Sequence, residues 1–76
     1  MKQILETIIK NMVENQEAVS INEKEEAEKI TYEVKVDNKD MGRVIGKQGK
    51  VANSIRTLMK ALGAKDKKKV NVDFLD

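Results

Sequence analysis

The sequence predicts a two-layer α+β domain in which helices cover one face of a three-stranded sheet. Three segments, at 18–22, 30–36 and 70–75, alternate apolar and polar residues as half-buried strands do. Two other segments, at 2–14 and 50–62, carry apolar residues at helical spacing. Because the chain has 76 residues, these elements are expected to form one domain around one core.

The first helix is expected over residues 2–14, where apolar side chains form one stripe and charged side chains the opposite one. Residues 18–25 allow two interpretations. The capping-box spacing of Ser20 and Glu23 favours a helix, but such a helix would carry too few apolar residues to anchor it. The alternation of Val19 and Ile21 favours a short strand over 18–22, followed by a charged connection over 22–28.

The other two strands have clearer patterns. Residues 30–36 alternate around an inward-facing Tyr32 and are expected to form a hairpin with 18–22. Residues 70–75 place Val70, Val72 and Phe74 on one face. The three strands are therefore expected to share a single apolar face.

Between the last two strands, a short helix is expected over Met41–Ile45, with Asp40 as its N-cap and Asn38 as a second candidate cap. A longer helix follows from about Lys50 to Leu62, and Gly63 stands where a helix C-terminal glycine is expected. The order is then α-β-β-α-α-β, divided into a leading helix and hairpin (1–37), a helix–loop–helix (40–63) and a final strand (69–75).

The composition excludes several classes of function. The sequence contains no Cys and no His, which excludes a thiolate or imidazole zinc site, a disulfide framework, and catalysis by Ser-His-Asp or Cys-His groups. We expect neither enzymatic activity nor a cofactor. There is no apolar run long enough to span a membrane and no signal-peptide pattern, so the protein is expected to be cytoplasmic.

The net charge of +2 conceals a division between two halves of the chain. Residues 1–40 carry six Lys/Arg and ten Asp/Glu, whereas residues 41–76 carry nine Lys/Arg and three Asp/Glu. A basic region on an otherwise acidic body is typical of a nucleic-acid partner.

The basic half begins with the segment Gly46-Lys47-Gln48-Gly49 between the two expected helices. Glycines at both ends allow a tight turn and a close approach by another backbone. Such a turn presents the first amides of the following helix, which attract phosphate oxygens, and Lys47 and Lys50 add full positive charges. The sequence therefore predicts a phosphate-binding loop.

The segment fits neither of the two common nucleotide-binding motifs. A Walker loop needs four residues between its glycines and then Lys-Ser/Thr, but Gly42 and Gly46 enclose three, and Lys47 is followed by Gln48. A dinucleotide fingerprint needs a glycine where Val44 stands.

The longer string Asp40-Met41-Gly42-Arg43-Val44-Ile45-Gly46-Lys47-Gln48-Gly49-Lys50 resembles the signature of KH RNA-binding domains. The element order is similar to the type II arrangement of that family. The resemblance covers essentially the whole chain and extends to the small stand-alone bacterial KH proteins of the KhpA family.

The resemblance implies a clamp on about four nucleotides of single-stranded RNA or DNA, with the GxxG loop against the backbone and the bases over an aliphatic groove. One departure is Ala52, where the family commonly has a larger aliphatic residue. The RNA-binding residues that we predict, partly from charge and partly from the resemblance, are Gly46, Lys47, Gln48, Gly49, Arg43, Lys50, Ile45, Ala52 and Arg56.

The resemblance also implies a homodimer, or a heterodimer with a larger KhpB-type KH protein. It implies the work of an RNA chaperone that influences gene expression, cell-envelope growth and cell length. The alternative is a protein-interaction adaptor that uses the same scaffold only to dimerise. The Lys65–Lys69 cluster could support RNA binding or only solubility.

Overall fold

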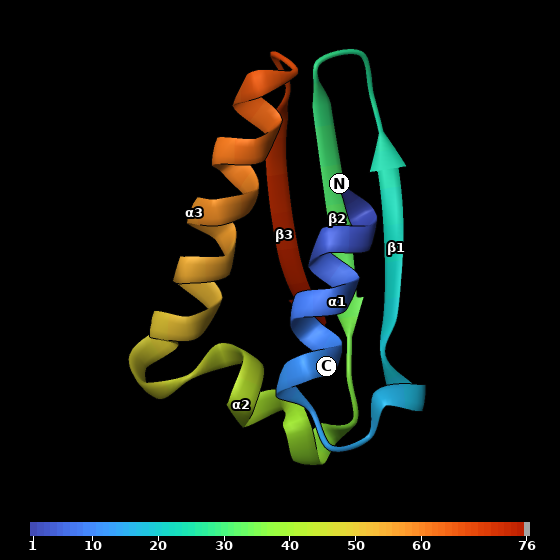
Figure 1. The fold of residues 1–76 in the computed structure, drawn as a ribbon, viewed down its shortest axis with the longest axis vertical. Helices are drawn as coiled ribbons and strands as arrows, with labels where there is room; N and C mark the ends of the chain where they lie inside the picture. Colours follow the sequence, from blue (N-terminus) through green and yellow to red (C-terminus); the bar gives the residue numbers. More distant parts are fainter. Residues whose placement is uncertain (76) are drawn as a thin grey trace.

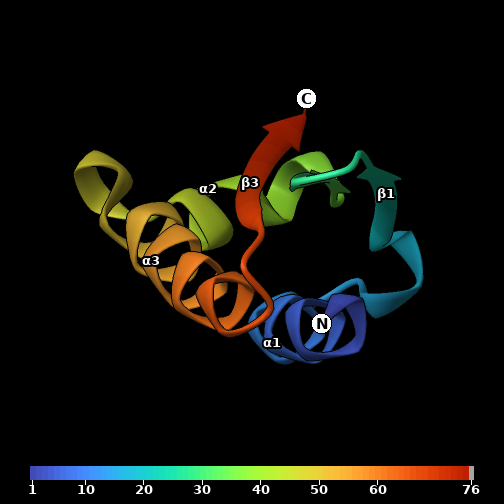
Figure 2. The ribbon, with the colours of Figure 1, turned by 90° about the horizontal axis from the view of Figure 1, so that it is seen from above.

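A computed structural model describes residues 1–75 in the expected order α-β-β-α-α-β. The helices and strands are α1 (Lys2–Met12), β1 (Ser20–Glu25), β2 (Lys29–Lys35), α2 (Met41–Ile45), α3 (Lys50–Lys65) and β3 (Lys69–Leu75). Figures 1 and 2 show α1 and α3 on the same side of the sheet, with α2 and its loop at one end. The predicted fold class is confirmed.

The sheet has the order β1-β2-β3. β1 and β2 form the expected antiparallel hairpin, with Ile21 opposite Val34. β2 and β3 are parallel, with Tyr32 opposite Val72. Parallel neighbours need a long crossover, and α2 and α3 provide it. This crossover places α3 beside the free edge of β3 (Figure 1).

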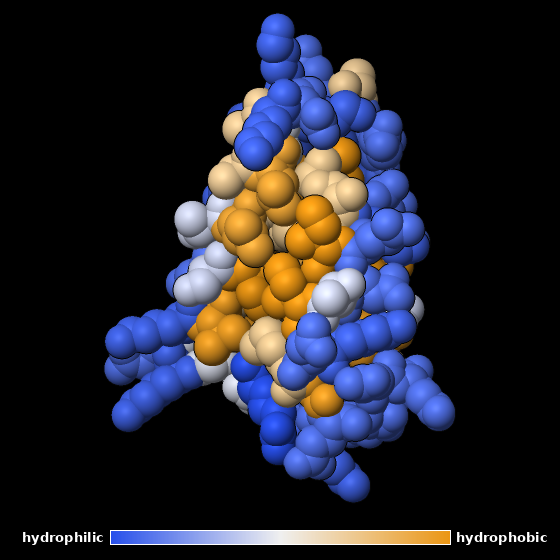
Figure 3. All heavy atoms as spheres, in the orientation of Figure 1, coloured by the Kyte–Doolittle hydropathy of each residue, from blue (hydrophilic) through white to orange (hydrophobic). Residues whose placement is uncertain are grey.

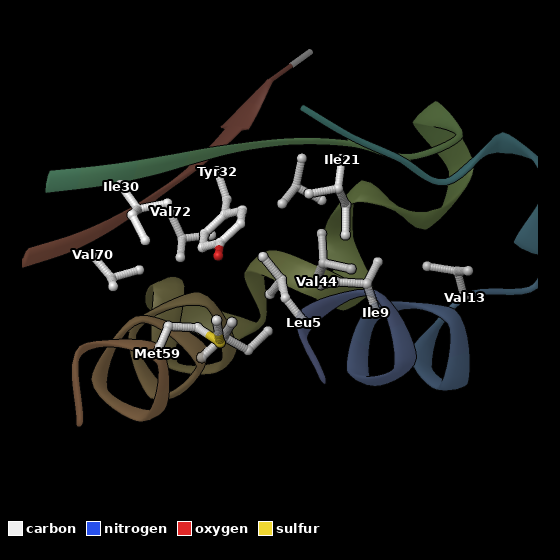
Figure 4. Packing of buried hydrophobic residues seen from close by; sticks show 12 residues of the cluster. Leu5, Ile9, Val13, Ile21, Ile30, Tyr32, Val44, Met59, Val70 and Val72 are labelled. Carbon is white, nitrogen blue, oxygen red and sulfur yellow. The ribbon is translucent and has the colours of Figure 1, made fainter. Parts of the chain in front are cut away.

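The core lies between the helices and the sheet (Figure 4). Tyr32 is fully buried in it, and its hydroxyl oxygen has no hydrogen-bond partner among the described residues. Figure 4 shows the Tyr32 hydroxyl pointing from the sheet towards the helices that carry Leu5 and Met59. Burial, together with a smaller effect of the neighbouring Glu23 carboxylate, raises the pKa of Tyr32 to about 12.

The first hairpin is longer than predicted. β1 continues through Glu25, although residues 22–28 were expected to be a charged connection. Polar pairs on the exposed side of the sheet accompany the extra pairing: Asn22 Nδ2 donates to Glu33 Oε1 at 3.2 Å, and Lys24 Nζ lies 3.5 Å from Glu33 Oε2. Cross-strand pairs of this kind favour strand without any apolar alternation.

The first helix is shorter than predicted. α1 ends at Met12 rather than at residue 14, because Val13 has extended backbone angles (φ −105°, ψ 154°). Val13 nevertheless remains in the core, at 7% exposed. An apolar residue at helical spacing can therefore be buried without belonging to the helix.

Gly63 does not end the long helix, contrary to the prediction, because α3 continues to Lys65. A Cβ at Gly63 would lie 2.3 Å from Val70 Cγ2 and 2.8 Å from the Lys68 carbonyl oxygen. Glycine is required there for close packing against β3.

The helix end uses Lys67 where glycine is usual. Lys67 has a left-handed φ of 58°. The Lys68 N–H donates to the Gly63 carbonyl and the Lys67 N–H to the Ala64 carbonyl, at 3.0 and 3.1 Å, which is the bonding pattern of a Schellman motif.

No helix within residues 1–75 is both long and apolar enough to cross a membrane.

Candidate nucleic-acid interface

The loop between α2 and α3 has an unusual backbone. Gly46, Gln48 and Gly49 all have positive φ angles, at 76°, 58° and 76°. The Gly49 N–H donates to the Gly46 carbonyl and the Lys50 N–H to the Lys47 carbonyl, which closes a turn with left-handed backbone at Gln48 and Gly49 that leads directly into α3. The predicted turn therefore forms, with positive φ angles at three of its four residues.

The two glycines of the loop are required for different reasons. Gly46 combines φ 76° with ψ 172°, a region that is almost exclusive to glycine, and a Cβ there would lie 2.4 Å from Val51 Cγ2. At Gly49 the nearest atom to a Cβ would be Asn53 Nδ2 at 3.9 Å, so only its φ favours glycine. The first glycine holds the loop against α3, and the second reverses the chain.

Gln48 is the non-glycine residue of this turn in the left-handed region. A residue with a Cβ pays about 1–2 kcal/mol for that conformation, and strain of this kind clusters at functional sites. The Gln48 side chain is exposed.

The loop carries positive charge that no carboxylate of the described chain neutralises by direct contact. Lys47 and Lys50 are exposed, and neither forms an ion pair with any residue from 1 to 75. The first turn of α3 contains no acidic residue. α3 has 16 residues, so its N-terminus adds about half a positive charge. In Figure 3 long hydrophilic side chains project from this part of the molecule.

Arg43 was predicted to flank the loop, but the structure pairs it with carboxylates. Its Nη2 donates to Glu14 Oε1 at 2.8 Å, and its Nε lies 3.7 Å from Asp40 Oδ1. The pair with Glu14 joins α2 to the segment after α1. Of the predicted cations, Arg43 is therefore the least available to a phosphate.

Asp40 does not cap α2 with its side chain, which corrects the prediction. Its carboxylate is 2% exposed and accepts the backbone N–H groups of Glu14 and Asn15, at 3.0 and 3.1 Å. Asp40 therefore links the start of α2 to the segment that follows α1, 26 residues earlier in the chain.

The side chain that accepts a capping hydrogen bond belongs to Asp37, which caps the 3-10 turn at Asn38–Asp40 just before α2 and lies one residue before the other predicted candidate, Asn38. Asp37 Oδ1 accepts the Lys39 N–H at 2.9 Å. This bond lowers the pKa of Asp37, and a bond from the Asn15 side chain lowers it further.

Arg56 lies between α3 and β3. Its Nε donates to the Val72 carbonyl at 3.0 Å, its Nη1 donates to Asn53 Oδ1 at 3.2 Å, and its guanidinium carbon lies 5.4 Å from the centre of the Phe74 ring. These contacts fix a cation beside the free edge of the sheet. Asn53 and Phe74 were not among the predicted site residues. Asn53 could have been found from the sequence, because it lies three residues before Arg56 on the same helix.

The two apolar residues of the predicted site differ in exposure. Ile45 is half-buried, whereas Ala52 is 1% exposed. Ala52 therefore supports the first turn of α3 from inside, and Ile45 offers apolar surface beside the loop.

These features define a class of domain: two helices joined by a glycine-bounded, positively charged turn, packed with a third helix on one face of a three-stranded sheet. That is the type II KH arrangement. The sequence profile described as "KhpA/KhpB, KH domain" matches residues 2–74.

Relatives match across their full length. The chain is 47% identical over 75 residues to RNA-binding protein KhpA of Caldanaerobacter subterraneus and to that of Clostridium perfringens, covering 99% of this chain and 100% of each relative. It is 41% identical over 76 residues to RNA-binding protein KhpA of Listeria monocytogenes, covering all of both chains. No solved structure matched the chain. The chain belongs to the KhpA/KhpB KH-domain family, which is non-enzymatic.

Proposed function

We propose that this chain is a cytoplasmic, single-stranded RNA-binding protein that clamps the RNA backbone with its GxxG loop. The observation that carries the proposal is a pair of exposed lysines, Lys47 and Lys50, at the N-terminus of a 16-residue helix, neither of which forms an ion pair with any of residues 1–75. The relatives named RNA-binding protein KhpA support RNA as the ligand.

In the proposed mechanism, phosphate oxygens accept hydrogen bonds from the amides at the start of α3, and Lys47 and Lys50 neutralise their charge. Gly46 and Gly49 have no side chains that would hold the backbone away. Gln48 projects from the turn and can donate from its amide. Arg43 contributes only to the extent that its contact with Glu14 opens.

The bases then lie towards the seam between α3 and β3. Ile45 provides apolar surface, Ala52 supports the first turn of α3 from inside, and Arg56 presents a fixed guanidinium. The sequence is only 3% aromatic, and Tyr32 is fully buried, so a stacking platform of the RRM type is not available on the sheet.

The proposal extends to a partner. Ile4 of α1 is 45% exposed and Leu58 of α3 is 43% exposed. Figure 3 shows apolar surface on the helical face between α1 and α3. This surface supports association with a second KH domain, either another copy of this chain or a larger KhpB-type KH protein. Two linked clamps would bind RNA more tightly than one.

The resemblance to the family supports a cellular role as an RNA chaperone that acts with that partner on gene expression, peptidoglycan homeostasis and cell length. The same apolar face supports a second candidate function, a dimerising adaptor that does not bind RNA. Binding of a four-nucleotide RNA to the unmodified chain and to a Leu58→Glu variant separates the two candidate functions. An RNA-binding protein binds this RNA with the same affinity in both chains, whereas an adaptor binds it in neither.

The proposed clamp is tested by replacing Lys47 and Gln48 together with Asp, which tolerates the left-handed turn. Lys2→Asp with Gln3→Asp is the matched control, because it changes the same residue types at an exposed position on α1. Binding of a fluorescent single-stranded RNA should be lost only in the loop variant, while circular dichroism shows both folded. On a four-nucleotide RNA, three phosphate contacts predict a slope of log affinity against log salt of about −2 for the unmodified chain. Unchanged affinity in the folded loop variant would refute the clamp.

A further inference from the structure

The seam between α3 and β3 contains a depression at the end away from the GxxG loop. It has a volume of about 430 Å³ and is lined by Lys60 and Ala64 of α3 and by Lys68, Lys69, Val70 and Asn71. Lys60 lies ten residues beyond Lys50 on the same helix, which corresponds to about 15 Å along the helix axis. The depression is therefore separate from the loop but on the same seam.

The lining is cationic. Among the described residues, it contains three lysines, one side-chain amide and no carboxylate. Lys68 forms an ion pair with Glu25 at 3.0 Å. Lys60 and Lys69 are exposed and form no ion pair with any of residues 1–75. The depression therefore keeps two charges that no carboxylate of the described residues neutralises by direct contact.

The acidic groups nearest along the chain belong to neighbouring turns rather than to the depression. The Glu28 carbonyl accepts the Lys69 N–H at 2.9 Å, which brings the tip of the β1–β2 hairpin beside the start of β3. Asp66 lies in the turn that ends α3. None of Glu25, Glu28 and Asp66 lines the depression.

The backbone of β3 adds hydrogen-bonding groups. The Val72 carbonyl accepts from Arg56 of α3, so it faces away from β2, whereas the Lys69 N–H faces the hairpin. Successive peptide groups of an edge strand alternate between the paired side and the free side. The N–H and C=O of Val70 therefore face the same free edge as those of Val72, where the depression lies.

Between the loop and the depression, Arg56 continues the positive charge along the seam, held by Val72 and Asn53. The order from one end to the other is Lys47 and Lys50, then Arg56, then Lys60 and Lys69. A row of cations beside hydrogen-bonding edge groups matches an extended polyanion that also carries polar bases, which is a single nucleic-acid strand.

We propose that RNA bound at the GxxG loop continues along the α3–β3 seam into this depression, where Lys60 and Lys69 contact additional phosphates. The inference rests on the proposed function, because the loop sets where the strand enters. It gives the chain a footprint longer than the four nucleotides that one KH clamp covers.

The test compares two oligonucleotides, a four-nucleotide and a ten-nucleotide oligouridine, by fluorescence anisotropy at several salt concentrations. The variant is Lys60→Gln with Lys69→Gln. The control is Lys2→Gln with Lys35→Gln, which removes the same charge from exposed positions outside the seam. All four side chains are exposed, so thermal unfolding is expected to be similar in the two variants.

On the ten-nucleotide RNA, loss of two contacts lowers the magnitude of the salt slope by about 1.4. Raising salt from about 50 to about 200 mM should therefore weaken binding about sevenfold more in the unmodified chain than in the Lys60/Lys69 variant. The four-nucleotide RNA should bind the unmodified chain, the control and the variant alike.

Equal slopes for variant and control on the long RNA would overturn the inference while leaving the loop clamp intact. An equal decrease of the salt slope on the four- and ten-nucleotide RNAs in the Lys60/Lys69 variant would also overturn the inference, because it would indicate a long-range electrostatic effect rather than a contact. If the unmodified chain binds an acidic peptide, and the Lys60/Lys69 variant loses that binding but binds RNA unchanged, the depression is a protein-binding site and the inference is wrong. Failure of the unmodified chain to bind the short RNA would instead refute the proposed function.

Discussion

The buried carboxylate of Asp40 makes the sharpest stability prediction. Asp40→Ala removes the acceptor of two backbone hydrogen bonds, from Glu14 and Asn15, and the 3.7 Å contact with Arg43. A hydrogen bond to a charged group contributes about 1.5–3 kcal/mol. Glu14 and Asn15 lie in an exposed segment, so water replaces part of what is lost. The expected cost is about 2–4 kcal/mol.

That cost is a large fraction of the stability of a chain this size, which at about 0.05–0.15 kcal/mol per residue is about 4–11 kcal/mol. With a urea dependence of about 1 kcal/mol per M, the unfolding midpoint should fall by about 2–4 M. Asp40→Asn keeps one oxygen acceptor and should cost about half as much. Far-ultraviolet circular dichroism in urea provides the measurement.

Asp37→Ala is the comparison variant, because the Asp37 side chain caps the 3-10 turn at Asn38–Asp40 and, within residues 1–75, its only bond to the segment after α1 is an exposed one from the Asn15 side chain. Its loss should cost only about 0.5–1 kcal/mol. If Asp40→Ala and Asp37→Ala lower the midpoint equally, Asp40 acts as an ordinary helix cap and the proposed link between the start of α2 and the segment after α1 is wrong.

Three further predictions concern backbone strain and the core. Gly46→Ala should destabilise the fold by about 2–4 kcal/mol, because the Cβ would meet Val51 and the backbone angles exclude other residues. Gly49→Ala should destabilise it by only about 1 kcal/mol. Equal urea midpoints for the two variants would contradict this difference. Tyr32→Phe should leave stability unchanged or raise it by about 1 kcal/mol, since the buried hydroxyl has no hydrogen-bond partner among residues 1–75. A tyrosine in the unfolded chain ionises near its ordinary pKa of 10.0, whereas the pKa of Tyr32 in the fold is about 12. The contribution of Tyr32 to the free energy of unfolding is therefore complete below pH 10. It declines as the pH rises towards 12, by up to about 2.7 kcal/mol. The Phe variant should lack that decline in denaturant titrations, and an identical decline would place its cause elsewhere. Lys67→Gly should stabilise the fold by about 0.5–1 kcal/mol and raise the melting temperature, because it removes a left-handed lysine. A lower melting temperature would contradict this prediction.

Local patterns predicted most of the fold. The alternation of 30–36 and 70–75, and the helical spacing of 50–62, follow from which faces must be buried, and the structure confirms the expected order and hairpin. The extension of β1 through Glu25 could not be predicted this way. It depends on polar pairing with Glu33 across the hairpin, which leaves no apolar pattern.

The errors at the candidate site come from contacts between distant residues. Asp40 has the composition and position of a cap, but its partners lie 25 and 26 residues earlier in the chain. Arg43 is tied to Glu14, 29 residues away. Gly63 was expected to end a helix, whereas its real constraint is Val70 on β3. In contrast, the strained turn from Gly46 to Gly49 is local, and its sequence indicated it directly.

The central claim is that the GxxG turn contacts the RNA backbone, and a nuclear magnetic resonance titration tests it most directly. Single-stranded RNA is added to the ¹⁵N-labelled chain, and amide shifts are followed along the sequence. The clamp predicts the largest shifts at the amides of residues 46–52, with smaller ones along the exposed side of α3. Shifts confined to the apolar face around Ile4 and Leu58, or no shift at any RNA concentration, would contradict it.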